Sequence, residues 1–420
     1  MPRLHPIKPP RIPPTSFPPP PSHPAPATFG RMAMDLAVVS ARGATRWQHA
    51  HPWIFKSDVV RFPSAPAGAV RVEDPRGRPI GTALWSPASE ISLRMVDRDT
   101  PAELDQPWWH DRLARAIARR DDIRRHSSAC RLVHGEGDAL PSLVCDRYDR
   151  WLVVQLMSAG LDTFQDQIVA ALVQLTGCDG ILARNDAAAR AREELPRETT
   201  LLHGDVPREI EVHEHGVKYL AAPWTGQKTG AFLDQRENRH RIGQLARGRA
   251  LDCFAYHGSF ALHLAANADT VVAVDSSSAA LERARQNAER NARANITFVE
   301  ADAFDDLRAR DRAGERFDTI VVDPPAFAKN RPSLPAAIRG YHEINLRALR
   351  LLAPGGIMFT ASCSYHLTKP LFLEMIEGAA ADSGRRIALR ELRTQPADHP
   401  EILTIPESGY LKGAILEAMD

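Results

Sequence analysis

The chain has 420 residues, of which 44% are hydrophobic and 25% are charged, and its formal net charge is +1. This length predicts a globular protein of roughly two to four domains, and no apolar run approaches the ~18 to 20 residues that span a membrane. The balanced charge excludes an inference about any partner from total charge. The five scattered cysteines favour a reducing cytoplasm and argue against a disulfide framework or a zinc cluster.

Residues 1–33 form a proline-rich tail, which we expect to be disordered or extended. Residues 34–106 contain short, partly alternating strand patterns separated by turn residues such as Pro66 and Gly77. These short strands predict a small β-barrel after the tail.

Residues 107–215 predict a linker helix followed by a small central α/β domain. Trp109, Leu113 and Ala116 recur at helical spacing and place the linker helix at 107–125. Further along, strands and helices are expected to alternate at 151–156, 163–175, 180–183 and 185–195. A hairpin is expected at 209–221, around the turn residues His215 and Gly216.

Residues 216–420 predict a Rossmann-like domain with a doubly wound, mainly parallel sheet, because strand patterns alternate with helical ones. The strands are expected at 249–252, 270–275, 296–302, 318–323 and 356–364. Ligands bind such sheets beyond the carboxyl ends of the strands. The residues at these ends are four carboxylates and one thiol, namely Asp252, Asp275, Asp302, Asp323 and Cys363.

The turn after the first strand of this domain indicates a ligand without phosphates. Gly258 is its only glycine, whereas a dinucleotide fingerprint has three, which let a pyrophosphate approach the backbone. Asp275 follows Asp252 by 23 residues, the spacing at which a carboxylate accepts hydrogen bonds from a ribose. Asp302 is placed for an adenine amino group. S-adenosylmethionine (SAM) fits these features, and a Rossmann-like turn without a ligand remains the alternative.

Cys363 lies between two serines at a strand end, beside the predicted cofactor site. Methylation of cytosine C5 needs a thiolate that first adds to C6, because C5 is a poor nucleophile. Asp323 is suited to assist at N3 if its surroundings keep it protonated. A buried, inert thiol is the alternative for Cys363.

The polar segment 226–239 carries more arginine and amide side chains than a surface loop needs, unless it is the salt-bridged start of a helix. Together with other stretches it resembles the class I SAM-dependent bacterial large-subunit (23S) rRNA 5-methylcytosine methyltransferases. Residues 51–55 and 81–89 resemble a PUA domain, an RNA-binding barrel. The stretches that carry the family resemblance are Gly226-Gln-Lys-Thr-Gly, Leu233-Asp-Gln-Arg, Asp252-Cys-Phe-Ala-Tyr-His-Gly-Ser-Phe, Asp323-Pro-Pro-Ala-Phe, Arg339-Gly-Tyr-His-Glu-Ile-Asn, Ser362-Cys-Ser and Tyr410-Leu-Lys-Gly.

The resemblance covers the chain from about Met34 to the C-terminus and implies roles for single residues. Cys363 would be the nucleophile and Asp323 the acid that orients the base. Cofactor contacts are expected from Phe232, Asp252, Phe254, Gly258, Asp275, Asp302, Asp323 and Pro324. Contacts to substrate RNA are expected from Gln235, Arg236, Arg239, Pro325, Phe327 and Lys329. Related RNA cytosine methyltransferases with two cysteines have the second one after the motif's proline, where this chain has Ala326.

The predicted architecture is therefore α/β: a PUA-like barrel at 34–106, a linker helix and central domain at 107–215, and a SAM-dependent methyltransferase domain at 216–420. The expected partner is ribosomal RNA, with neither a metal nor a membrane, and a homodimer stays open. One alternative function is amino-directed methylation of guanine N2 or adenine N6 in RNA, which favours an aromatic residue directly after Asp-Pro-Pro. The other is a non-catalytic RNA-binding protein.

Overall fold

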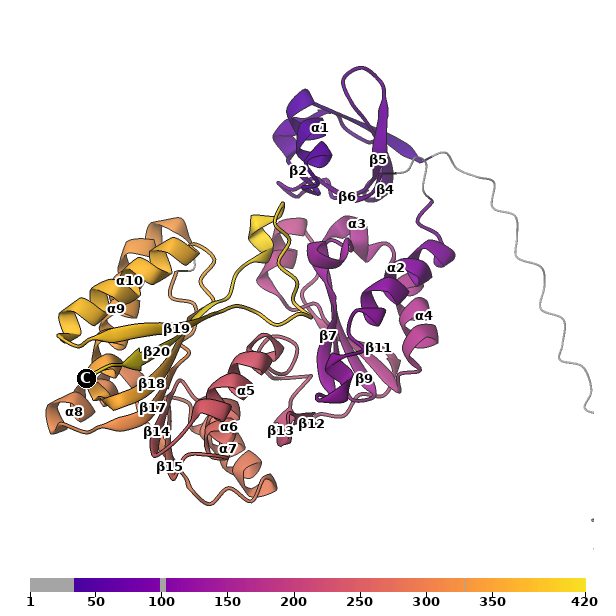
Figure 1. Cartoon of the computed structure of the whole chain (residues 1–420). Coiled ribbons are helices and arrows are strands. Elements are labelled where there is room, and N and C mark those ends of the chain that lie inside the picture. Colours follow the sequence, from indigo (N-terminus) through magenta and orange to yellow (C-terminus); the bar gives the residue numbers. More distant parts are fainter. Residues whose placement is uncertain (1–33, 99–102, 329) are drawn as a thin grey trace, which may run out of the picture. The chain divides into compact units, whose positions relative to one another are not determined.

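The computed structural model describes residues 34–98, 103–328 and 330–420 (Figure 1). The proline-rich tail at 1–33 and Lys329 lie outside the described residues. The described part contains a six-stranded, a five-stranded and a seven-stranded sheet and a two-stranded hairpin. None of its helices is both long and apolar enough to cross a membrane.

The first sheet has the strand order β2-β6-β5-β4-β1-β3, and β1 and β4 are its one parallel pair. Its strands are β1 (Asp35–Val39), β2 (Trp53–Ile54), β3 (Val59–Arg61), β4 (Gly68–Glu73), β5 (Pro79–Trp85) and β6 (Leu93–Asp97), with helix α1 (Ala41–Gln48) after β1. Val70 and Val72 are buried while the residues that flank them are partly exposed, as expected for a strand with one face on a core. With β2 and β3 at its two edges, the sheet is a half-barrel rather than a closed barrel.

The second sheet has the order β11-β10-β9-β8-β7 and carries helices α2 (Gln106–Ala118) and α4 (Gln165–Thr176). Its strands are β7 (Ala129–His134), β8 (Leu143–Tyr148), β9 (Trp151–Leu156), β10 (Gly180–Arg184) and β11 (Thr199–Gly204). The predicted helix at 107–125 ends at Ala118, since Arg120 turns inward to form a buried ion pair with Asp138. The helix expected at 185–195 is a 3₁₀ segment, Ala188–Glu193.

The predicted hairpin consists of β12 (Ile210–Glu214) and β13 (Val217–Ala221), which pair in an antiparallel register. It crosses the predicted boundary between residues 215 and 216. The three larger sheets each lie within one of the predicted segments, and the domain boundaries themselves stay predictions.

The seven-stranded sheet has the order β16-β15-β14-β17-β18-β20-β19, with β20 antiparallel to both neighbours. The strands are β14 (Arg249–Cys253), β15 (Thr270–Asp275), β16 (Ile296–Glu300), β17 (Phe317–Val322), β18 (Leu352–Ser362), β19 (Ile387–Arg393) and β20 (Lys412–Ala418). The predicted doubly wound, mainly parallel sheet is confirmed. The chain winds in opposite directions from β14, so the crevice where ligands bind lies between β14 and β17.

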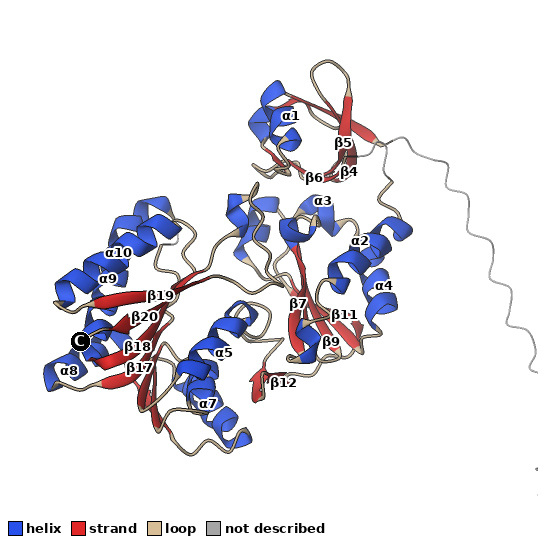
Figure 2. Cartoon of the chain, in the orientation of Figure 1, coloured by secondary structure: helices blue, strands red, loops and turns tan. Residues whose placement is uncertain are grey.

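Helices cover both faces of this sheet (Figure 2). One face carries α8 (Ala303–Ala313), α9 (Leu334–Leu351) and α10 (Lys369–Ser383), whose side chains join the largest apolar cluster with Phe317 and Met358. The other face carries α5 (Arg236–Leu245), α6 (Ser259–Leu264) and α7 (Ser278–Arg290), which are labelled in Figure 1. Burial on both faces explains why β14, β15 and β17 read as apolar runs in the sequence.

Candidate active site

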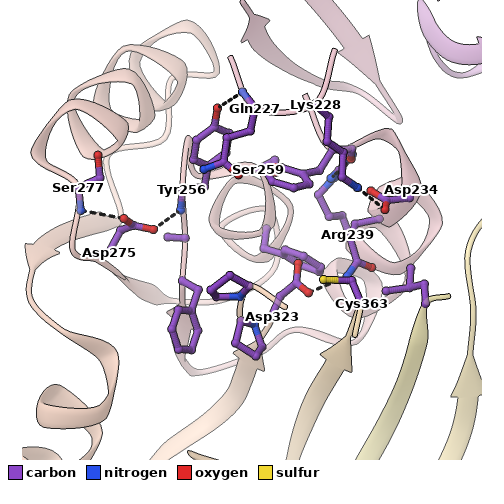
Figure 3. Close-up of a pocket in the computed structure, with 18 of the residues that line it drawn as sticks. Gln227, Lys228, Asp234, Arg239, Tyr256, Ser259, Asp275, Ser277, Asp323 and Cys363 are labelled. Carbon is purple, nitrogen blue, oxygen red and sulfur yellow. Dashed lines mark hydrogen bonds and ion pairs between the residues drawn. The ribbon is translucent and has the colours of Figure 1, made fainter. Parts of the chain in front are cut away.

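A pocket of about 320 Å³ opens at the carboxyl ends of β14, β15, β17 and β18 (Figure 3). Most of the predicted site residues line it: Phe232, Gln235, Arg239, Phe254, Asp275, Asp323, Pro324, Pro325 and Cys363. Parallel strands deliver their ends to one edge of a sheet, so residues more than 100 positions apart in the chain meet here.

The loop after β14 takes the left-handed backbone conformation at Phe254, Tyr256 and Gly258, with φ of 65°, 49° and 80°. Asp275 holds this loop, because its Oδ2 accepts from the backbone N–H of Tyr256 at 2.8 Å and its Oδ1 accepts from that of Ser277 at 2.8 Å. Each carboxylate oxygen can accept a further hydrogen bond. Asp275 is thus positioned and still able to accept from ligand hydroxyls.

Three predicted cofactor residues lie outside the residues that line the pocket. Asp252 is buried; its Oδ2 accepts from the N–H of Ala261, its Oδ1 has no partner among the described residues, and burial raises its pKa well above the usual value. Asp302 is exposed and caps α8, where the backbone N–H groups of its first turn donate to it. A Cβ at Gly258 would lie 3.0 Å from that of Ala284, so this glycine lets the loop approach α7 closely.

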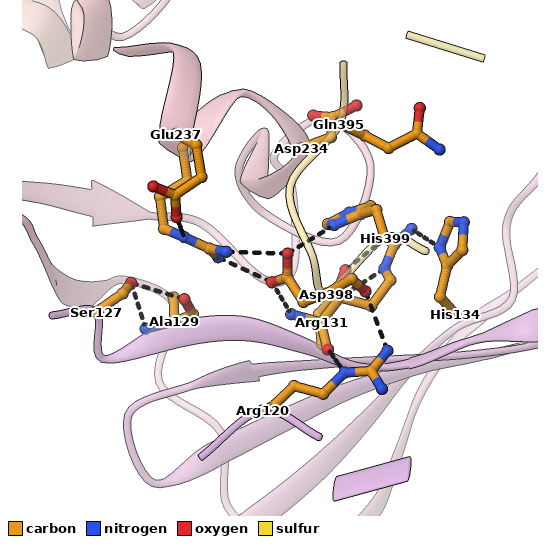
Figure 4. A network of polar contacts seen from close by, with 12 residues as sticks. Arg120, Ser127, Ala129, Arg131, His134, Asp234, Glu237, Gln395, Asp398 and His399 are labelled. Atoms are coloured by element: carbon orange, nitrogen blue, oxygen red, sulfur yellow. Dashed lines mark hydrogen bonds and ion pairs between the residues drawn. The ribbon is translucent and has the colours of Figure 1, made fainter. Parts of the chain in front are cut away.

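Two of the predicted RNA contacts, Arg236 and Arg239, form buried ion pairs. Arg239 makes a two-pronged pair with Glu214, and Arg236 makes one with Asp398, at N–O distances of 2.7–2.9 Å. The Asp398 pair belongs to a polar network that joins α5 to the second sheet (Figure 4). Arg236 does not line the pocket and stabilises the start of α5 beside it, whereas Arg239 lines the pocket.

The other residues predicted to contact RNA differ in whether they line the pocket. Gln235 donates from Nε2 to Oδ1 of Asp323 at 2.7 Å. Phe327 packs against the ring of Tyr341, with centroids 4.6 Å apart, and does not line the pocket. Lys329 lies outside the described residues.

Asp323 and Cys363 face the same pocket in different electrostatic states (Figure 3). Burial, with the nearby negative charge of Asp234, raises the pKa of Asp323 to about 7. Burial and the carboxyl of Asp323 raise the pKa of the Cys363 thiol to about 11, against the opposing effect of the Lys228 ammonium. Near neutral pH, Asp323 can thus carry a proton while Cys363 is mainly a thiol.

The turn that carries Cys363 is fixed by its neighbours. The Ser364 hydroxyl shares a hydrogen bond of 2.9 Å with the hydroxyl of Tyr341 and accepts from the N–H of Ala328. The buried Lys412 ammonium donates to the carbonyl oxygen of Ser364 at 2.6 Å. A thiol held in this way can point into the pocket without rearrangement of the backbone.

Sequence reasoning missed a charged cluster made by Lys228, Asp234 and Tyr410. Lys228 pairs with Asp234 at 2.5 Å, and the hydroxyl of Tyr410 donates to the same carboxylate at 2.9 Å. Lys228 also lies 4.8 Å from the centroid of Phe232. Lys228 and Asp234 lie in the polar segment 226–239, whereas Tyr410 comes from near the C-terminus, more than 170 residues further along the chain.

The pocket suits a nucleoside that carries no phosphate. Its lining cations among the described residues are Lys228 and Arg239, and both are neutralised by Asp234 and Glu214. A phosphate would need free cations or a glycine-rich turn. Aromatic and proline surfaces beside the Asp275 carboxylate fit the adenosyl group of SAM and its sulfonium charge.

Replacement of Asp275 by alanine is expected to weaken SAM binding by ~1 to 3 kcal/mol, because hydrogen bonds to a charged group are lost. Titration calorimetry with SAM would measure the effect. Asp269→Ala, at an exposed position in the loop before β15, is the matched control. Equal affinities of the Asp275→Ala protein and the control would remove Asp275 from the cofactor site.

Comparisons with known proteins identify the family. Residues 130–409 match the S-adenosylmethionine-dependent methyltransferase family, and residues 38–98 match the PUA-like domain. The chain is similar to ribosomal RNA large subunit methyltransferase I of Tolumonas auensis, with 40% identity over 380 residues that cover 88% of this chain and 96% of that protein. The protein of the same name from Shewanella amazonensis is 39% identical over 374 residues, covering 87% and 94%.

Solved structures agree on the fold. A SAM-dependent methyltransferase from Streptococcus mutans has a TM-score of 0.78 at 21% identity, covering 91% of this chain and 100% of that one. A second solved structure with the same TM-score is that of a methyltransferase complexed with SAH. SAM is therefore the cofactor, and the chain belongs to the ribosomal RNA large subunit methyltransferase I family of SAM-dependent methyltransferases with an N-terminal PUA-like domain.

Proposed function

We propose that this protein methylates C5 of a cytosine in large-subunit ribosomal RNA through a covalent bond between Cys363 and C6 of the base. The RNA follows from the names of the relatives and the PUA-like domain. The observation that carries the chemistry is that the Cys363 thiol and the Asp323 carboxyl line the same pocket as Asp275.

The Cys363 thiol and the Asp323 carboxyl fit the addition step. Bound SAM supplies an electrophilic methyl group. The Cys363 thiolate adds to C6, while a proton on Asp323 hydrogen-bonds N3 and draws electron density from the ring. C5 becomes enamine-like and can take the methyl group. A base, to which no residue is assigned, then removes the C5 proton, and elimination expels the thiolate and restores the aromatic ring. Gln235 orients Asp323 throughout, through its hydrogen bond to Oδ1.

Amino-directed methylation receives less support from the site. Such an enzyme stacks its target base on an aromatic residue directly after Asp-Pro-Pro, and here Ala326 occupies that position. The next residue, Phe327, is packed against Tyr341. An exocyclic amine also needs no thiol, which would leave Cys363 without a role.

The test is a mechanism-based trap. Large-subunit RNA that contains 5-fluorocytosine is expected to form an adduct with the protein that survives denaturation, because fluorine at C5 cannot leave as a proton does. Cys363→Ala should abolish the adduct, and Cys178→Ala, at a buried cysteine of the second sheet's domain, is the matched control. Methyl transfer that survives in Cys363→Ala would favour an amino target. No SAM binding in the wild type would favour a non-catalytic RNA-binding protein.

The two pKa values predict the pH dependence of kcat/KM for RNA. The reactive form needs protonated Asp323, with a pKa of about 7, and the thiolate of Cys363, with a pKa of about 11. Below pH 7 the rate should rise about tenfold per pH unit as thiolate forms; above it, loss of the Asp323 proton offsets that gain and the profile flattens.

Asp323→Asn tests this assignment, because its amide is a donor at every pH. The variant should be slower than the wild type below pH 7. Its profile should not flatten above pH 7, so that its rate keeps rising with pH. Initial rates from about pH 6 to 9 would measure both profiles. If the profile of the variant still flattens near pH 7, the titrating group is not Asp323.

A further inference from the structure

We infer that a second cavity, of about 200 Å³, binds an unpaired guanine base of the RNA next to the target cytosine. The inference rests on the proposed RNA substrate and adds a site that reads a neighbouring nucleotide. The cavity lies where the first sheet, the second sheet and the loop between β19 and β20 meet. Its polar and aromatic lining residues are Trp53, His134, Glu136, Glu407, Ser408 and Tyr410.

The cavity has a position next to the reaction pocket. Tyr410 lines it, and the hydroxyl of Tyr410 donates at 2.9 Å to Asp234, which lines the reaction pocket. Tyr410 thus links the linings of the two cavities, an arrangement in which adjacent nucleotides of an unstacked single strand can reach both.

The lining favours a base over a phosphate. No lysine or arginine lines the cavity in the described part of the chain, so it offers no cation to a phosphate group. Trp53 and Tyr410 provide ring surfaces of the kind on which single-stranded bases stack. The volume is below the ~300 to 1,000 Å³ of sites for drug-sized ligands, which fits a single base.

The choice of guanine follows from the two carboxylates. Glu136 accepts from Nε1 of Trp53 at 2.9 Å through Oε1, and Glu407 bonds His51 at 3.1 Å through Oε2, so each has a second oxygen outside these contacts. Carboxylates accept hydrogen bonds and cannot donate them. Guanine presents N1–H and the N2 amino group side by side on its Watson–Crick edge, two donors that match such an acceptor.

The cavity is held in shape by the polar network behind it (Figure 4). Asp398 binds Arg236 and accepts from the N–H of Arg131, which anchors the start of the loop that carries Glu407. Gln395 donates to the carbonyl oxygen of Ser408 at 2.6 Å and closes the loop on itself. A preformed cavity of this kind loses little conformational entropy when a ligand enters.

Ligand-observed NMR with guanosine 5′-monophosphate and inosine 5′-monophosphate as probes tests the inference. The full chain would be saturated with S-adenosylhomocysteine so that the cofactor region is filled. Inosine lacks only the N2 amino group, so the guanosine probe is expected to bind about tenfold more tightly, as the loss of one hydrogen bond to a carboxylate implies. Equal binding of the two probes would overturn the inference.

Glu136→Gln assigns the discrimination to this cavity. Its amide oxygen can still accept from Trp53, so the fold is retained, but the charge that attracts two donors is gone. The variant should bind both probes alike, and Glu407→Gln should reduce the discrimination as well. Glu374→Gln, at an exposed position on α10, is the matched control and should discriminate as the wild type does. Discrimination that persists in both cavity variants would place the guanine elsewhere.

The outcome is separable from that of the proposed function. If the fluorocytosine trap fails while Glu136→Gln removes guanine discrimination, the cavity stands and the cysteine chemistry falls. If the trap succeeds and the probes bind alike, the chemistry stands and the guanine site falls. Binding of S-adenosylhomocysteine should be equal in all variants, which verifies that each is folded.

Discussion

Cys363→Ala is expected to reduce methyl transfer to large-subunit RNA by about 10⁴-fold or more, the scale of loss when a covalent nucleophile is removed. Without the sulfur, C5 of cytosine keeps its aromatic character and cannot attack a methyl donor. The affinity for SAM should change little, because Asp275 and the loop at Tyr256 are untouched. Transfer of a labelled methyl group would measure the rate, and calorimetry the affinity.

A second substitution separates the sulfur from the shape of its side chain. Cys363→Ser keeps the size of the residue and its hydrogen-bonding capacity but replaces the thiol by a hydroxyl that is far less acidic. It should be as inactive as Cys363→Ala. A serine variant with more than about a tenth of wild-type activity would contradict a covalent role, because a single methyl transfer to an exocyclic amine tolerates the exchange.

Asp398→Ala is expected to lower the free energy of unfolding by ~3 to 5 kcal/mol. The Asp398 and Arg236 side chains are both fully buried, and they pair through two hydrogen bonds of 2.8 and 2.9 Å. Removal of the carboxylate leaves two nitrogens of the buried Arg236 guanidinium without their partner, and only the pair with Glu237 at Nε remains. It also frees the N–H of Arg131 and the ring of His399.

Urea denaturation of the full chain would measure the loss. Asp122→Ala is the control, since Asp122 pairs with Arg125 where both side chains are more than three quarters exposed, and it should change stability by under ~1 kcal/mol. The ion pairs and hydrogen bonds hold the pKa of Asp398 far below its usual value. Its contribution is therefore present at neutral pH and is lost as pH falls through the folded-state pKa. A loss below 1 kcal/mol for Asp398→Ala would show that the network is dispensable.

The residues that share the reaction pocket were predictable to a large degree. Asp275, Asp323 and Cys363 each follow an apolar run of strand length, and the ends of parallel strands meet at one edge of a sheet. The local sequence pattern was therefore enough to predict that these three residues lie close together. Asp302 has the same kind of pattern, but β16 ends at Glu300 and the two further residues carry Asp302 to the cap of α8.

The ion pairs of Arg236 and Arg239 were harder to predict, because their partners are distant in the sequence. Arg236 is 162 residues from Asp398, and Arg239 is 25 residues from Glu214. A polar segment at 226–239 is compatible both with RNA contacts and with buried ion pairs. The difference between these lies in which carboxylates the fold brings near, which no local spacing encodes.

The periodicity of apolar residues and the position of strand ends were enough to place the sheet, the cofactor edge and the thiol, because these depend on short-range geometry. The folded chain had to be known for the ion pairs of Arg236 and Arg239, for the Lys228–Asp234–Tyr410 cluster and for the second cavity. These features join segments that are separated by up to several hundred residues. Their energies come from burial and charge, which depend on every element packed around them.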